Sequence, residues 1–145
     1  MYTWVWRLTP HPLLTSFDAP DPTLTCTRRS RSNTPLQALT LLNDAAFVEF
    51  AQGLASRLIR EGPLDDAGRI GYAFRLCTSR SPSDDEVKVL SAVLAKERTA
   101  FGSSRNDAKS IAGDKRAAGT DEQEFAAWVM VSRVVLNVDE AITRE

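Results

Sequence analysis

The sequence predicts an all-α fold, a bundle of about five helices that follows an irregular, proline-rich N-terminal arm. Three observations support this prediction. Capping boxes, in which Ser or Thr is followed three residues later by Glu or Gln, begin at Thr34, Ser83 and Thr120. Between these points, apolar residues recur at the spacing of one helix face. By contrast, the first 34 residues contain four prolines, which disfavour helix.

Composition indicates one soluble globular domain. The chain of 145 residues is 43% hydrophobic and 26% charged, as is usual for such a domain. Its formal net charge of -1 lacks the basic excess of nucleic-acid-binding proteins, so no nucleic-acid partner is expected. We divide the chain into an arm over 1–34 and a helical bundle over 35–145.

The first two helices of the bundle have clear start signals. Thr34 is the predicted N-cap, Pro35 suits the first helical position, and Gln37 completes the capping box. Either Asn43 or Asp44 then caps a second helix. Gly62 and Pro63 are expected to end this second helix. The apolar faces of the two helices consist of Leu36, Leu39 and Leu42, and then Phe47, Phe50, Ala51, Leu54, Leu58 and Ile59.

Two further helices follow. Asp65 or Asp66 begins the third, with Ile70, Ala73, Phe74 and Cys77 on one side. Ser83 and Glu86 form the capping box of the fourth, which is expected to run to about Phe101 with Val87, Leu90 and Leu94 inward.

The last third of the chain is predicted to contain a loop and a central helix. Residues 102–119 are small and polar, which favours a mobile loop. Thr120 and Gln123 then form a capping box for a helix that is apolar almost all round from Phe125 to Leu136. Its β-branched residues leave a buried strand as the alternative. A helix of this kind is expected at the centre of the bundle.

No targeting or membrane-spanning segment is evident. The N-terminal segment lacks the basic and apolar regions of a signal peptide, so the chain taken alone is expected in the cytoplasm. The longest apolar run, residues 125–138, is too short and too polar to span a bilayer. Tyr2, Trp4 and Trp6 alternate as in a strand and need a surface to pack against. That surface is the helices, missing chain, or a sugar ring.

The arginines before the first helix are the main candidate site. Arg28, Arg29 and Arg31 precede Thr34, where free N–H groups at a helix start attract anions. The competing and favoured interpretation is structural. In it, these arginines pair with Asp18, Asp21 or Asp44 and hold the arm to the bundle.

Other chemistry has little support in the sequence. The spacing of Asp18, Asp21, Asn43 and Asp44 matches no calcium loop, and His11 is the only histidine. There is no catalytic, nucleotide-binding or metal-binding motif. We therefore assign no catalytic, cofactor-binding or metal-binding residue. Two cysteines, Cys26 and Cys77, allow one disulfide if the protein is exported, or two free thiols.

Several segments resemble a known family. They are FDAPD, then Cys26 with Arg28 and Arg29, SNTPLQALTLLND, RIGYAFRLCTSRSPSDDEV and LNVDEAITRE. Together they resemble the C-terminal part of the planctomycete cytochrome-c-associated family of unknown function (domain of unknown function 1553, planctomycete-specific type). Ala45 departs from the family's usual Pro, Trp6 from its Lys and Ala141 from its aromatic residue.

The resemblance implies a C-terminal fragment of a longer, exported protein, so that Met1 would not be the true start and the chain would be periplasmic or extracellular. Partners would be upstream domains or a cytochrome-c domain, with haem in the parent or partner. A Cys26–Cys77 disulfide becomes worth testing. The family has no assigned reaction, so whether the protein is an enzyme stays open.

Three functions are therefore considered. The first is a structural or interaction module. The second is part of a cytochrome-linked redox enzyme acting on an extracellular substrate, with Asp18, Arg28 and Arg29 near its site. The third is an anion-binding module that uses the Arg28–Arg31 segment.

Overall fold

The structure, a computed structural model, describes residues 9–21, 23–28, 32, 34–116 and 118–142. All regular secondary structure in these ranges is helical, which confirms the predicted all-α fold. The helices are α1 (Pro12–Ser16), α2 (Pro35–Asn43), α3 (Ala45–Glu61), α4 (Asp66–Thr78), α5 (Asp84–Ser103), α6 (Arg105–Ala112), a short 3₁₀ turn η1 (Gly113–Lys115), α7 (Glu122–Leu136) and α8 (Asp139–Ile142).

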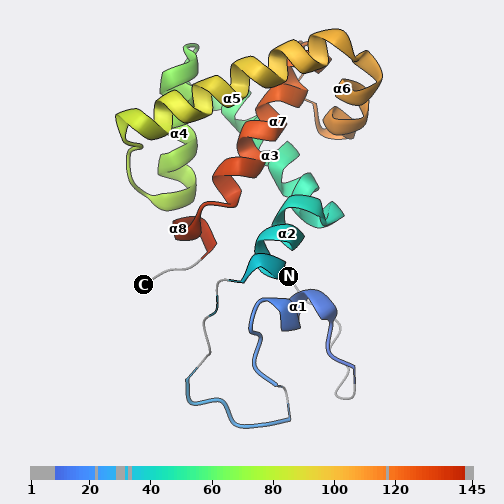
Figure 1. Ribbon diagram of the computed structural model, residues 1–145, viewed down its shortest axis with the longest axis vertical. Coiled ribbons are helices and arrows are strands. Elements are labelled where there is room, and N and C mark those ends of the chain that lie inside the picture. The colour runs from blue at the N-terminus through green and yellow to red at the C-terminus, as the bar shows by residue number, and fades with distance from the viewer. Residues whose placement is uncertain (1–8, 22, 29–31, 33, 117, 143–145) are drawn as a thin grey trace.

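Helix α7 lies at the centre of the bundle, as its apolar sequence predicts. It packs against α3, α5 and α6, and more lightly against α2, α4 and α8 (Figure 1). Phe125, Trp128 and Val131 are fully buried. Because α7 contacts nearly every other helix, it organises the core.

Most of the predicted helix starts are confirmed. The hydroxyl of Thr34 accepts from the Gln37 amide while the Gln37 side chain accepts from the Thr34 amide, which closes the capping box of α2. Asp44 caps α3, Asp65 caps α4, and Ser83 caps α5. The predicted cap of α7 at Thr120 is wrong by one residue. Asp121 takes that place, because its carboxylate accepts from both Gln123 N and Glu124 N.

The structure differs from the loop predicted over 102–119. Arg105–Ala112 forms α6, on which Ala108 and Ala112 are buried in contact with the core. Gln52 also donates from Nε2 to the carbonyl of Ile111 at 2.9 Å and so joins α6 to α3. In the sequence, these small residues favour a loop. In the structure, they allow α6 to pack closely against α7.

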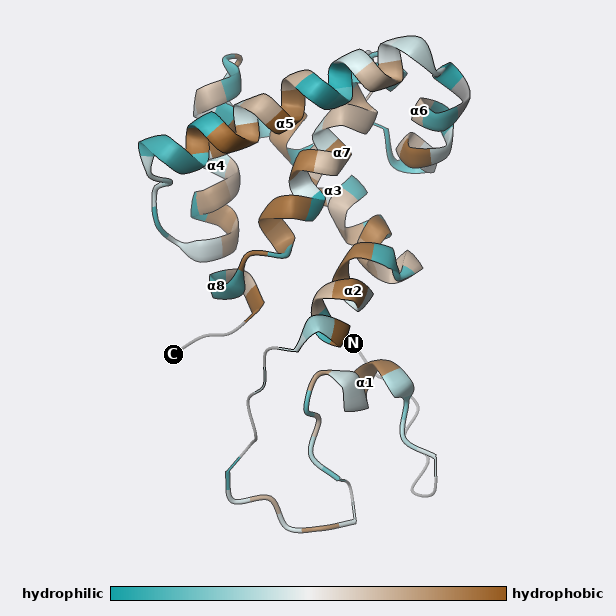
Figure 2. Ribbon diagram, in the orientation of Figure 1, coloured by the Kyte–Doolittle hydropathy of each residue, from teal (hydrophilic) through white to brown (hydrophobic). Residues whose placement is uncertain are grey.

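The outward face of α2 is a second departure from expectation. Leu36 and Leu39 are 62% and 57% exposed, whereas Gln37 and Leu41 are the buried residues of this helix. Figure 2 shows the hydrophobic residues that α2 carries. The side chain of Arg133 on α7 donates to the carbonyl of Leu42, which turns this side of α2 inward. The predicted apolar face therefore points mostly to solvent.

Gly62 ends α3 as predicted, but for a reason of space. Its φ of -75° is ordinary for any residue, so left-handed backbone is not what requires glycine here. A Cβ at this position would lie 2.5 Å from the backbone oxygen of Leu58 and 3.2 Å from Cγ of Arg69. Glycine is therefore needed because the α3–α4 turn folds back closely on α3.

Gly62→Ala is expected to lower the free energy of unfolding by about 1–3 kcal/mol, as overpacking against fixed backbone does. Chemical denaturation with urea measures this loss. Gly53→Ala is the matched control, since a Cβ at Gly53, in the middle of α3, meets nothing within 4 Å. We expect this control to be neutral or stabilising. Equal effects for the two variants would contradict the steric explanation.

Across the described ranges, no helix is both long enough and apolar enough to cross a membrane.

Candidate functional site

A buried glutamine joins the arm to the bundle. Gln37 is only 2% exposed, and its Nε2 donates to the carbonyl of Ser16 at 2.8 Å and to Oγ of Ser32 at 3.0 Å. Its Oε1 is already occupied by the Thr34 amide. One side chain thus caps α2 and holds two separate parts of the arm. We call this set of contacts the Gln37 lock.

Asp18 completes the Gln37 lock from the arm side. Its Oδ2 accepts from the amide and the hydroxyl of Ser32 at 2.8 and 2.6 Å, and lies 3.5 Å from Nε2 of Gln37. The residue has a left-handed φ of 55°, a conformation that Asp tolerates better than most residues. The Asp18 carboxylate therefore already places a negative charge of the protein itself beside the start of α2.

Aromatic contacts bind the same part of the arm to α3. The rings of Phe17 and Phe47 lie 5.7 Å apart, and Phe47 meets Phe50 edge-on at 5.7 Å. Phe50, which the apolar pattern predicts to face inward, is 52% exposed at the end of this row. The row lies on the side of α3 rather than in the core.

The residues predicted as an anion site are only partly described. Arg28 is exposed and lines a cleft together with Cys26, whereas Arg29 and Arg31 lie outside the described residues. Thr34 uses its hydroxyl in the cap of α2. Among described residues no ion pair involves Arg28, and the predicted pinning of the arm by the three arginines together stays a prediction. The Gln37 lock and the Phe17–Phe47 contact are the links between arm and bundle that the described residues show. Tyr2, Trp4 and Trp6 also lie outside the described residues.

Both cysteines are free thiols, not the disulfide that export would favour. Cys26 is exposed on the arm, where its Sγ donates to the carbonyl of Arg28 at 3.4 Å. Cys77 is partly buried on α4, and this burial raises the pKa of its thiol. The two residues thus lie on different parts of the chain, since the arm contacts α2 and α3 through the Gln37 lock and Phe47.

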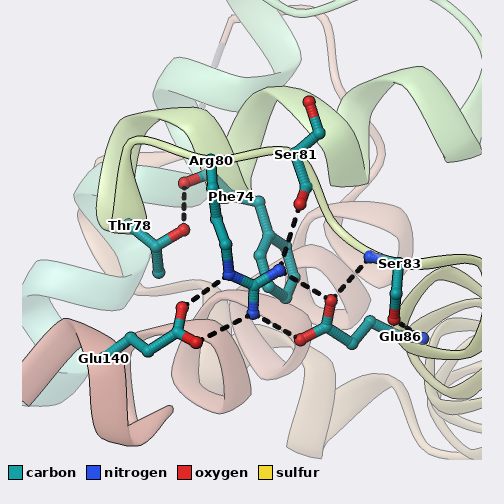
Figure 3. Close-up of polar contacts among 7 residues, drawn as sticks. All are labelled: Phe74, Thr78, Arg80, Ser81, Ser83, Glu86 and Glu140. Atoms are coloured by element: carbon teal, nitrogen blue, oxygen red, sulfur yellow. Dashed lines mark hydrogen bonds and ion pairs between the residues drawn. The ribbon is translucent and has the colours of Figure 1, made fainter.

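Arg80, in the turn between α4 and α5, is the most completely bonded charged side chain in the described structure. Its guanidinium reaches Glu86 on α5 from two nitrogens at 2.6 and 2.9 Å, and Glu140 on α8 from two at 2.6 and 3.3 Å (Figure 3). The fifth N–H donates to the carbonyl of Ser81, and the guanidinium lies over the ring of Phe74. All five donors of Arg80 are used, which leaves none for a ligand.

This contact joins two segments on which the sequence resemblance depends. Arg80 belongs to SRSPSDDE, and Glu140 belongs to the closing LNVDEA. Glu86 has two roles, because its Oε2 also accepts from the amide of Ser83 in the capping box of α5. The Arg80 cluster therefore fixes the α4–α5 turn and anchors α8.

The stability of the fold is expected to decrease in acid as the Glu86 carboxylate of the Arg80 cluster is protonated. Hydrogen bonds from Arg80 and from the Ser83 backbone lower the pKa of Glu86 from 4.5 to about 2. Because the folded pKa is the lower one, the contribution is full above pH 4.5 and is lost as the pH falls towards 2. Thermal melts from pH 7 to pH 2 should therefore show a gap between wild type and Glu86→Gln that closes over this interval. A gap that does not change with pH would rule out this role.

A second arginine joins three helices. Arg98 on α5 contacts Asp66 on α4 at 2.6 and 3.0 Å, and Glu124 on α7 at 2.6 and 2.8 Å. Trp128 donates from its indole to Glu124 at 2.9 Å. Hydrogen bonds from Arg98 hold the pKa of both carboxyl groups below their usual range.

The sequence does not indicate the Arg98 cluster, and of the Arg80 cluster it indicates the Ser83–Glu86 capping box but not the bonds that Arg80 makes. The partners of Arg98 are 26 and 32 residues away, so no local spacing indicates them. Within the described ranges, no group of three His, Cys, Asp or Glu side chains could hold a metal ion.

The fold and its contacts define a class: a helical module in which the best-bonded charged side chains join one helix to another. The model of a family described as "PSD1: Protein of unknown function (DUF1553)" matches residues 1–94, which is 94 of the 145 residues. The chain belongs to this family. No curated protein matches the chain, and no solved structure matches it.

Proposed function

We propose that the chain is the C-terminal helical module of a larger exported bacterial protein, and that it binds the part of that protein which precedes it. Membership of the family supports the comparison with such proteins. The parent would be of the planctomycete type that is associated with cytochrome-c domains. Any haem would then belong to the parent or to a partner domain.

The outward face of α2 is the observation that carries this proposal. Leu36 and Leu39 follow one another at i, i+3 and are both more than half exposed. The polar neighbours on this side make local bonds: Thr40 donates to the carbonyl of Leu36, and Asn43 to that of Leu39. The face therefore offers apolar side chains and few free polar groups, as a protein-binding surface does.

The position of this face favours the preceding chain as its occupant. Helix α2 directly follows the arm, and the Gln37 lock fixes the arm to the opposite, buried side of the same helix. Chain that precedes the arm is covalently tied to α2 and is therefore held at a high effective concentration near Leu36 and Leu39. The Arg80 and Arg98 clusters, in contrast, lie on the helices farther along the chain and have their carboxylate partners within it.

The test is the association state of the chain, alone and with the upstream part of its full-length protein. Light scattering and an apolar-surface dye should show an exposed patch on the isolated chain, covered when the upstream part is added in trans. A Leu36→Ser, Leu39→Ser double variant should lose this binding while keeping its helical circular dichroism.

The matched control is Val89→Ser on α5, where an isolated valine is 61% exposed. It should bind as the wild type does. If the isolated chain is a folded monomer that binds neither the dye nor the upstream part, the interaction role is excluded. Binding of a cytochrome-c domain instead would reassign the partner and contradict the occupant proposed here.

A further inference from the structure

Two segments of the arm, within residues 15–21 and 26–28, line a cleft. It has a volume of about 330 Å³ and is lined by Thr15, Asp18, Ala19, Pro20, Asp21, Cys26 and Arg28. This volume lies at the lower end of the range for small-molecule sites. The lining unites the FDAPD segment with the Cys26–Arg28 segment, which are separate in sequence. The Gln37 lock and the outward face of α2 use neither Asp21 nor Arg28.

The rim of the cleft is set by bonds within the protein. Asp18 is held by Ser32, and Asp21 Oδ1 accepts from the amide and the hydroxyl of Thr23 at 2.8 and 2.6 Å. The thiol of Cys26 donates to the carbonyl of Arg28. These bonds hold Asp18, Asp21 and Cys26 in place, so that the Arg28 side chain is the main group that a ligand has to order.

Two opposite charges on this rim have unused bonding capacity. The guanidinium of Arg28 makes no ion pair or hydrogen bond within the described residues, and Oδ2 of Asp21 accepts none there. They are not paired with each other, so their charged atoms lie more than 4.0 Å apart. The bonds from Thr23 also keep the pKa of Asp21 low, so that it stays ionised.

We infer that this cleft binds a small zwitterion, a molecule with one carboxylate and one ammonium group. The carboxylate pairs with Arg28, whose planar guanidinium suits a carboxylate. The ammonium group donates to Asp21 Oδ2, and the methylene groups between them lie against Ala19 and Pro20. A ligand with both charges bridges two groups of the protein that do not reach each other. This binding site is separate from the interaction role proposed above.

The experiment titrates the full chain with ω-amino acids of increasing length: glycine, β-alanine, 4-aminobutyrate and 6-aminohexanoate. Two-dimensional NMR follows the amides of Thr23, Cys26 and Arg28 and the Arg28 side-chain N–H. Saturable shifts confined to these residues are expected, strongest for the one length that fits the gap. Butyrate and butylammonium, which each carry one of the two charges, should bind about tenfold more weakly than that zwitterion.

Variants separate the site from general charge effects. Arg28→Gln and Asp21→Asn should each weaken binding about tenfold, whereas Arg75→Gln, an exposed arginine on α4, should not. No saturable shift with any member of the series would overturn the inference. So would equal affinity for butyrate, or undiminished binding by Arg28→Gln. Because both rim variants leave α2 unchanged, dye binding and upstream association report separately on the interaction role.

Discussion

Replacing Trp128 with alanine is expected to lower the free energy of unfolding by about 3–5 kcal/mol, the largest single-residue loss in this protein. Trp128 is fully buried on the central helix α7. Its indole donates to Glu124, and the guanidinium of Arg69 lies 5.1 Å from its ring centroid. The substitution therefore opens a cavity and also removes a hydrogen bond to a charged group and a cation–π contact.

Urea denaturation followed by circular dichroism measures this loss. A second variant separates the contribution of the indole N–H from that of the ring, and a third serves as the control. Trp128→Phe keeps most of the ring but loses the indole N–H, so it should cost less than half as much as Trp128→Ala. Val89→Ala, at an exposed site on α5, is the control and should change stability by less than about 0.5 kcal/mol. A loss below about 1 kcal/mol for Trp128→Ala would mean that α7 is not the centre of the cooperative core.

The parts of the fold that sequence predicts well are those set by local chemistry. The starts of α2 and α5 follow from capping boxes, in which a side chain bonds a backbone group only three residues away. The central place of α7 follows from its composition, since a helix that is apolar all round has to be covered on every side. These features depend on little beyond the segment itself.

The parts that sequence predicts poorly depend on what lies opposite each helix. The apolar pattern places Leu36 and Leu39 inward, but α2 turns Gln37 and Leu41 inward, because Gln37 bonds the arm. Likewise, α6 has too few large apolar residues to be distinguished from a loop, and its alanines matter only because α7 is there to pack against. Tertiary contacts decide both cases.

The candidate site shows the same division. The sequence identifies the FDAPD segment and the Cys26–Arg28 segment, but not that the two line one cleft. The sequence also predicts that arginines attach the arm to the bundle, because they can form ion pairs with the nearby aspartates. Among the described residues a neutral amide, that of Gln37, bonds two parts of the arm. A glutamine in a capping box carries no sequence signal for this second role.

Gln37→Met is therefore expected to release the arm while leaving the bundle folded. The variant keeps the side-chain volume but removes the bonds to Ser16 and Ser32 and the one to Thr34. Leaving these partners unpaired, of which Ser16 and Ser32 are half-buried, should weaken docking of the arm by about 2–3 kcal/mol. Hydrogen exchange of the Ser32 amide, which donates to Asp18, should then accelerate by about 30- to 150-fold.

Gln52→Met is the matched control, because Gln52 on α3 also bonds a distant backbone carbonyl, that of Ile111. It should speed exchange around α6 and leave Ser32 unchanged, while Gln37→Met does the reverse. If Ser32 exchanges equally fast in wild type and Gln37→Met, then Phe17 and Phe47 suffice to hold the arm and the amide is only a helix cap. If the whole bundle unfolds instead, the arm is part of the cooperative core rather than an element docked on it.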